Sequence, residues 1–114
     1  MTNLSIGIFQ EENGPQVFQL TGPFTIGTMS DFQTLVRERK AAVTLIDLRA
    51  VPYMDSWALG SLLGFHVSCQ RDGRKYGLVG AAPRLKSLFK VAGVDGILVM
   101  YDTMAAARKL AAKA

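Results

Sequence analysis

The chain has 114 residues, which is enough for one hydrophobic core and too few for two, so we expect a single domain over residues 1–114. Apolar residues make up 49% of it and charged residues 19%, a balance that excludes a disordered chain. The net charge is +4, and no apolar run is long enough to span a bilayer, so we expect no membrane insertion.

The charge is unevenly distributed along the chain. Residues 1–36 carry no Lys or Arg and a net charge of −3, whereas residues 37–114 carry all thirteen basic residues and a net charge of +7. Most of the basic residues fall at expected helix ends or on solvent-facing helix positions, which favours ordinary solvated faces over direct binding of nucleic acid. An acidic partner surface or a nearby anionic lipid remains open as an alternative.

Two features bear on the compartment. The N-terminal stretch lacks the basic residues and continuous apolar run of a signal peptide. Cys69 is the only cysteine, so no internal disulfide can form. We therefore expect a cytoplasmic protein.

The chain opens with a predicted hairpin. Leu4–Phe9 alternates apolar and polar or small residues, as a half-exposed strand does, and Gln16–Thr21 reads as its partner. Asn13-Gly14-Pro15 between them is typical of a turn.

A first helix follows, with Ser30 and Asp31 as candidate caps and with Phe32, Leu35 and Val36 as its inward stripe.

The central strand leads into a second helix. Ala42–Asp47 is β-branched and apolar, which suits a strand buried on both faces. Pro52 then disfavours helix at the residue before it, and Asp55 and Ser56 can cap a helix over Ser56–Arg71. The pattern thus predicts a carboxylate and a hydroxyl at the positive end of a helix, a place suited to an anion or to a phosphoryl group added later.

The remainder alternates strand and helix. The predicted elements are the strand Tyr76–Val79, the helix Pro83–Val91, the strand Ile97–Tyr101 and the helix Asp102–Ala112. Alternation after a hairpin predicts parallel pairing with right-handed crossovers, hence an α/β domain with a mixed sheet, a parallel core and packed helices.

The segment around Ser56 resembles the signature of the STAS domain family of anti-sigma factor antagonists, D-[LF]-x-x-V-x-[FY]-[MI]-D-S-S-G-L-G. The matching residues are Asp47, Leu48, Val51, Tyr53, Met54, Asp55, Ser56, Leu59 and Gly60. Trp57 stands where a second serine is usual and Ala58 where glycine is usual. Gly22–Thr25 stands where the family has G-E-[LI]-D, so its acidic residue is missing.

The resemblance implies the element order ββαβαβαβα and a binding module that is not an enzyme. It implies that Ser56 is phosphorylated by its partner, an anti-sigma factor of the histidine-kinase-like ATPase type. It also implies that the Gly22–Thr28 loop, with Thr25, lies near this serine and shares the partner surface. A competing role within the same resemblance is a STAS subunit that binds the ATPase of a lipid-transport ABC system without phosphorylation. A small-molecule sensor using a pocket near Trp57 and Tyr53 is a third hypothesis.

Each candidate residue also has a structural interpretation. Ser56 could be only a helix cap, although Asp55 can fill that role and leave the hydroxyl free. Trp57 falls on the same helix side as Gly60, Ser61 and Gly64, and we expect it either to anchor a partner or to fold back against Tyr53 or Phe24. The two glycines permit close packing inside the fold or close approach by another backbone.

No catalytic or metal site is expected. His66 is the only histidine, and without a second ligand or an acid pair it reads as a hydrogen-bonded core residue. No Gly-rich phosphate loop occurs, so we expect no cofactor. Whether the protein forms a homodimer is left open by the sequence.

Overall fold

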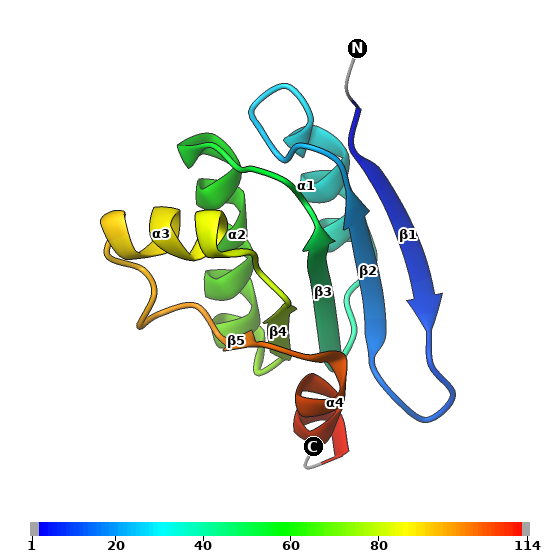
Figure 1. Cartoon of the computed structure of the whole chain (residues 1–114). Coiled ribbons are helices and arrows are strands. Elements are labelled where there is room, and N and C mark those ends of the chain that lie inside the picture. The colour runs from blue at the N-terminus through cyan, green and yellow to red at the C-terminus, as the bar shows by residue number, and fades with distance from the viewer. Residues whose placement is uncertain (1–2, 113–114) are drawn as a thin grey trace.

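The computed structural model describes residues 3–112, which form a five-stranded sheet with helices on both faces (Figure 1). The strands are β1 (Ser5–Gln10), β2 (Gln16–Thr21), β3 (Val43–Ala50), β4 (Lys75–Val79) and β5 (Met100–Tyr101); the helices are α1 (Met29–Glu38), α2 (Ser56–Asp72), α3 (Pro83–Val91) and α4 (Met104–Ala112). This is the predicted order ββαβαβαβα. The fold class predicted from periodicity is confirmed.

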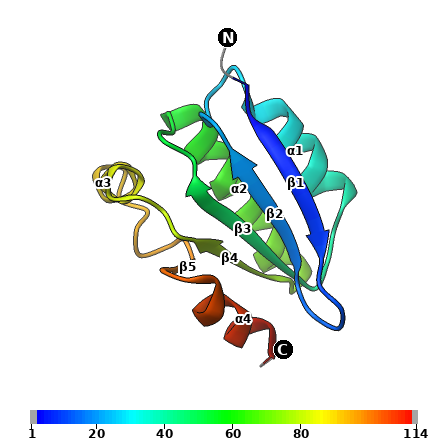
Figure 2. The same ribbon diagram turned by 45° about the vertical axis from the view of Figure 1, so that its right-hand side comes forward.

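The sheet follows chain order from β1 to β5. β1 pairs antiparallel with β2 through a turn in which Asn13 adopts φ 53°, a left-handed conformation that Asn tolerates well. The strands β2, β3, β4 and β5 are parallel to one another. One helix connects each of these strands to the next and returns the chain to the end of the sheet where the previous strand began. In Figure 2, β1 forms the free edge of the sheet.

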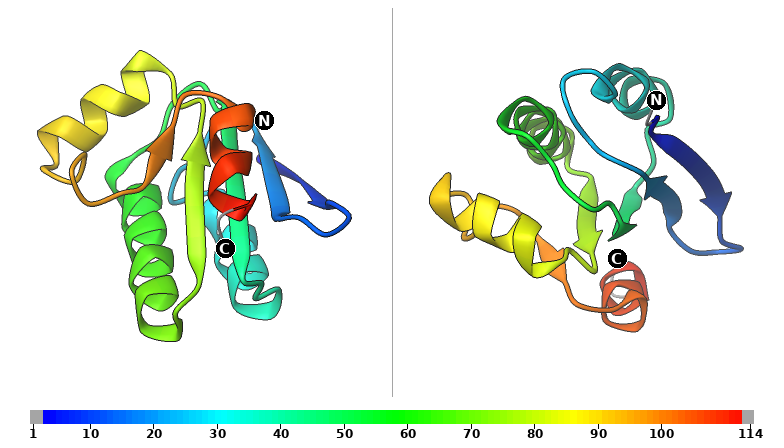
Figure 3. Two further views of the ribbon diagram at one scale, coloured as in Figure 1. Left: turned by 90° about the horizontal axis from the view of Figure 1, so that it is seen from below. Right: turned by 45° about the horizontal axis from the view of Figure 1, so that its top comes forward.

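The period-two alternation of the strands divides the interior into two layers. Phe18 and Ile46 belong to the larger core under α1 and α2, whereas Val17 and Leu45 face α4. Figure 3 shows α1 and α2 on one side of the sheet and α4 on the other.

A row of aromatic rings fixes α1 and α2 against each other. Phe24 in the β2–α1 loop packs edge-on against Phe32 of α1, with ring centroids 5.1 Å apart. Phe32 in turn contacts Phe65 of α2 at 6.2 Å, and Phe65 contacts Tyr76 of β4 at 5.4 Å. Edge-to-face pairs of this kind stabilise a fold beyond their buried area, so the spacing between α1 and α2 is well determined.

The bounds of β1, the start of β3 and the start of β4 differ from the prediction by one residue, and two other strand boundaries differ by three. β3 continues past Asp47 to Ala50, because Asp47 accepts hydrogen bonds from Arg49 and can therefore lie inside a strand. The last strand is shorter than Ile97–Tyr101: the Val94 carbonyl accepts from the N–H groups of Ile97 and Leu98, and this turn delays β5 to Met100.

Two helix starts differ as well. α1 begins at Met29 after Thr28, so Ser30 and Asp31 lie in its first turn and do not cap it. α4 begins at Met104 and not at Asp102, because Thr103 precedes the helix and its hydroxyl accepts from the Ala106 N–H at 3.1 Å. Across residues 3–112, no helix has both the length and the apolar character needed to span a membrane.

Candidate functional site

The N-terminus of α2 is organised by Asp55. This residue has extended backbone angles, and its Oδ1 accepts a hydrogen bond from the Ala58 N–H at 2.9 Å. Asp55 is therefore the N-cap of α2; of the two residues predicted as candidate caps, Asp55 and Ser56, it is the one that caps the helix. Ser56 is the first residue of the helix and is exposed to solvent, with its hydroxyl not needed for capping.

The second carboxylate oxygen of Asp55 holds the neighbouring loop. Asp55 Oδ2 accepts from the Ile26 N–H at 2.9 Å. The backbones of Phe24 and Met54 form an isolated parallel bridge beside it, with the Asp55 N–H donating to the Phe24 carbonyl at 3.2 Å. The Gly22–Thr28 loop thus lies against the start of α2, as the resemblance implied.

Hydroxyl groups brace this loop from within. Thr28 Oγ1 accepts from the Thr25 N–H at 2.9 Å and donates to the Pro23 carbonyl at 2.8 Å. Thr25 is half-buried, and its own hydroxyl accepts from the Gly27 N–H at 3.2 Å. The loop therefore presents a defined shape next to Ser56 and does not depend on the acidic residue that this chain lacks.

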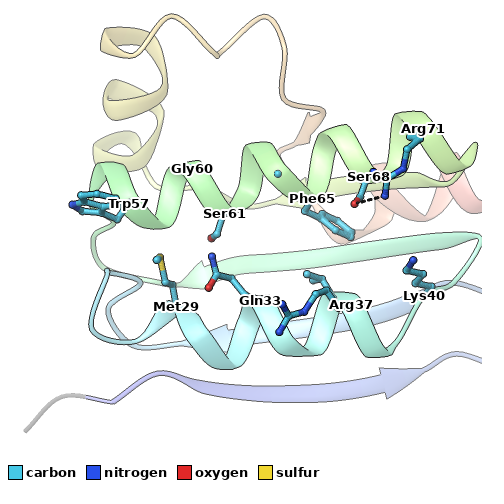
Figure 4. A pocket seen from close by; sticks show the side chains of 12 residues that line it. Met29, Gln33, Arg37, Lys40, Trp57, Gly60, Ser61, Phe65, Ser68 and Arg71 are labelled. Carbon is cyan, nitrogen blue, oxygen red and sulfur yellow. Dashed lines mark hydrogen bonds between the residues drawn. The ribbon is translucent and has the colours of Figure 1, made fainter.

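Trp57 points away from the core and is 62% exposed. Phe24 is fully buried and Tyr53 contacts Arg84, whose guanidinium lies 5.6 Å from the Tyr53 ring centroid. The exposure of Trp57 favours the alternative in which it anchors a partner over the one in which it folds back against Tyr53 or Phe24. The indole instead lies at one end of a groove between α1 and α2 (Figure 4).

We call this feature the α1–α2 groove; it has a volume of about 720 Å³. Its α1 side consists of Met29, Gln33, Val36 and Arg37 with Lys40 just beyond the helix, and its α2 side of Trp57, Gly60, Ser61, Gly64, Phe65, Ser68 and Arg71. The predicted grouping of Trp57, Gly60, Ser61 and Gly64 on one face is therefore seen. The Ser61 hydroxyl donates to the Ala58 carbonyl at 2.6 Å, inside its own helix.

The structure thus separates the predicted site residues into two adjoining places. Thr25, Asp55 and Ser56 meet at the start of α2, and the other four line the groove. Sequence reasoning missed the α1 side. The spacing of Met29, Gln33 and Arg37 was the available signal, since residues four apart share a helix face.

His66 is half-buried, and its Nδ1 lies 2.7 Å from the Tyr76 hydroxyl, which also accepts from the Val99 N–H at 3.1 Å. His66 is therefore hydrogen-bonded, as predicted, but it lies at the edge of the core and not within it. Burial raises the pKa of the Cys69 thiol, which disfavours a reactive thiolate. Within residues 3–112, no three His, Cys, Asp or Glu residues come together in a way that could hold a metal ion.

Asp47 is buried on the face of the sheet that α4 covers, opposite the face that packs against α1 and α2. Burial raises its pKa, but hydrogen bonds and the charge of Arg49 outweigh burial, so that the pKa lies below its usual value. Arg49 donates from Nε and Nη2 to the two carboxylate oxygens at 2.9 and 2.8 Å. The pair lies beside Met104 and Arg108 of α4 and not in the α1–α2 groove.

Comparisons with solved structures place this fold among known ones. An anti-sigma factor antagonist from Mycobacterium paratuberculosis is 18% identical, with a TM-score of 0.83 over 96% of this chain and 94% of that one. A sulfate transporter family protein from Wolinella succinogenes is 22% identical, with a TM-score of 0.75 over 92% of this chain and 89% of that one.

The phosphorylated form of the Bacillus cell fate determinant SpoIIAA is 14% identical, with a TM-score of 0.69 over 93% of this chain and 99% of that one. At such identities these likenesses show the fold alone. No curated protein sequence matches the chain.

The family model described as the STAS domain matches residues 8–107. That range includes the whole of β2 to β5 and of α1 to α3, together with parts of β1 and α4. It therefore contains the start of α2 that Asp55 caps. The chain therefore belongs to the STAS domain family.

Proposed function

We propose that the protein is an anti-sigma factor antagonist, a binding module without catalytic activity that is switched by phosphorylation of Ser56. Its partner would be an anti-sigma factor of the histidine-kinase-like ATPase type, which it binds in the cytoplasm while Ser56 is unmodified. The observation that carries the proposal is the exposed Ser56 at the first position of α2, beside a cap formed by Asp55.

The position of Ser56 suits a switch that leaves the fold intact. A phosphate adds a charge of about −1.5 to −2 at neutral pH. The first N–H groups of a helix have no intrahelical acceptor and the helix dipole is positive there, so α2 would tolerate the phosphate. The same charge beside Asp55 would repel an acidic partner surface or be poorly solvated against an apolar one.

The surroundings of Ser56 provide a contact surface. Trp57 follows it directly and is largely exposed, and Trp is the residue type most enriched among interface anchors. The braced loop that contains Thr25 lies on the other side, tied to Asp55 through the Ile26 N–H. A partner that covers this area would contact Ser56 from both sides.

Two structural neighbours lend support to the proposal. SpoIIAA is described as an anti-sigma factor antagonist and was solved in unphosphorylated and phosphorylated forms, with TM-scores of 0.72 and 0.69 to this chain. Both forms of that protein share the fold of this chain.

The test is a kinase assay with purified components. The ATPase-type anti-sigma factors encoded in the source genome are each incubated with the protein and ATP, and the site of modification is mapped by mass spectrometry. We expect one phosphate on Ser56 and none on the Ser56→Ala variant. Modification at another residue, or none with any of the ATPases, would contradict the switch.

A second candidate is a STAS subunit that binds the ATPase of a lipid-transport ABC system without phosphorylation. The exposed Trp57 in place of a serine and the missing acidic residue at Gly22–Thr25 favour it. The neighbouring genes distinguish the two roles, since the first predicts a kinase and a sigma factor and the second an ATPase and a permease.

A further inference from the structure

The outer face of α2 has an unusual composition for a helix surface. Ser56–Gln70 contains no Asp, Glu, Lys or Arg, although Trp57, Gly60 and Gly64 are all exposed. A surface helix normally carries charged residues on its solvent side. Depletion of charge together with an exposed aromatic residue is typical of the core of a protein interface.

The fold gives no internal reason for the two glycines in this helix. A Cβ placed at Gly60 or Gly64 would meet no atom within 4 Å, so neither glycine makes room for a neighbouring element. Glycine inside a helix lowers its stability, and here no contact within the chain offsets that loss. The bare backbone at these two positions leaves room for another chain to approach closely.

The groove is elongated, because the residues that line it follow one another along α1 and α2 (Figure 4). α1, which forms one side of the groove, has ten residues and is about 15 Å long, or nearly three turns. The groove is open along this length between the two helices (Figure 4). Such a channel suits an extended cylinder laid along it better than a compact molecule that needs to be enclosed.

The two ends of the groove differ in chemistry. Trp57 and Met29 form an apolar end, whereas Lys40 and Arg71 form the other end, with Arg37 part-way along toward it. No Asp or Glu lines the groove. Asp72 lies outside it, 3.9 Å from Lys40 and 3.4 Å from Arg71, and offsets part of their charge. An excess of positive charge therefore remains at this end.

We propose that the α1–α2 groove receives an amphipathic helix of the partner protein, with apolar side chains at the Trp57 end and acidic side chains over Arg37, Lys40 and Arg71. The inference rests on the proposed function, because it names the element by which the same partner is bound. It predicts a second contact area that extends about three helical turns beyond Ser56.

The test compares two substitutions on the same helix. Gly64→Gln fills the groove with a good helix former, and Val67→Gln places the same side chain on an exposed position of α2 outside the groove. Affinity for the purified ATPase-type anti-sigma factor is measured by calorimetry. We expect Gly64→Gln to weaken binding about tenfold or more, and Val67→Gln to change it less than twofold. Thermal melting of each variant shows whether it is folded.

A charge variant tests the polarity of the groove. Arg37→Glu should weaken the same binding, and the loss should shrink in high salt because exposed charges are screened there. If the unmodified protein binds the anti-sigma factor and Gly64→Gln binds it with equal affinity, the groove is not a binding site for the partner. The proposed function would still stand. Failure of the unmodified protein to bind any of the ATPases would overturn both.

Two further outcomes would assign the groove to another occupant and so contradict the proposal. One is self-association of the protein alone that Gly64→Gln abolishes, seen by sedimentation. The other is binding of vesicles containing phosphatidylglycerol, followed by the fluorescence of Trp57, the only tryptophan, and lost in Gly64→Gln.

Discussion

Replacement of Asp55 should separate two roles that its carboxylate plays at once. Oδ1 caps α2 through the Ala58 N–H, and Oδ2 holds the Gly22–Thr28 loop through the Ile26 N–H, both at 2.9 Å. Asp55→Ala removes both hydrogen bonds. Asp55→Asn keeps one oxygen, and Asn is as good a cap as Asp, so only the loop contact is lost.

The magnitudes follow from these contacts. Loss of a helix cap costs about 1 kcal/mol, and loss of a hydrogen bond to a charged acceptor about 1.5 kcal/mol, taken low because the Ile26 amide is exposed. We therefore expect Asp55→Ala to lower the free energy of unfolding by about 2.5 kcal/mol, or the melting temperature by about 10 °C for a chain of this size. Asp55→Asn should lower it by about half as much.

Urea unfolding followed by circular dichroism measures these differences, and an unchanged slope with denaturant shows that the unfolded state is comparable. The matched control is Ser56→Ala, one residue further on, which should change stability by less than about 0.5 kcal/mol because the hydroxyl is exposed and does not cap the helix. A loss below about 0.5 kcal/mol in Asp55→Ala, or a larger loss in Ser56→Ala, would refute this assignment of the cap.

Further predictions concern backbone strain and pH. Gly22→Ala should destabilise the fold far more than Gly73→Ala: both glycines have positive φ, but only at Gly22 would a Cβ clash with a backbone oxygen, that of Asn3. Comparable thermal melting of the two variants would contradict this. The pKa of Asp47 is lowered in the folded state, so its contribution to stability should be present at neutral pH and decline as pH falls through its folded pKa. Asp47→Asn should flatten this acid-induced loss in a pH series of urea titrations, whereas an unchanged pH profile would show that the pair with Arg49 contributes nothing.

Much of the fold was accessible from local sequence signals. The start of α2 was predicted correctly because Pro52 prevents an earlier helix and Asp55 supplies the cap, two effects that operate within a few residues. The hairpin was predicted for the same reason, since the turn chemistry of Asn13–Pro15 is local. The late start of β5 was not predicted. Ile97 is apolar and β-branched, which favours a strand, yet it lies in a turn in which its N–H donates to the Val94 carbonyl.

The site was predictable only in part. Residues on one helix face can be grouped from spacing alone, which is why Trp57, Gly60 and Gly64 were placed together. Which helix lies opposite them depends on the aromatic contacts that join Phe32 to Phe65, and these contacts join residues 33 positions apart in the chain. The α1 side of the groove therefore emerged only from the structure.

The central claim is that the charge on Ser56 decides whether the partner binds. The direct measurement is the affinity of the purified ATPase-type anti-sigma factor for the protein with and without a phosphate on Ser56, at one salt concentration. The account predicts that the phosphate weakens binding by tenfold or more, about 1.4 kcal/mol, while the far-ultraviolet circular dichroism and the melting temperature stay nearly unchanged. Equal affinity of the two forms, or a phosphorylated protein that unfolds, would contradict it.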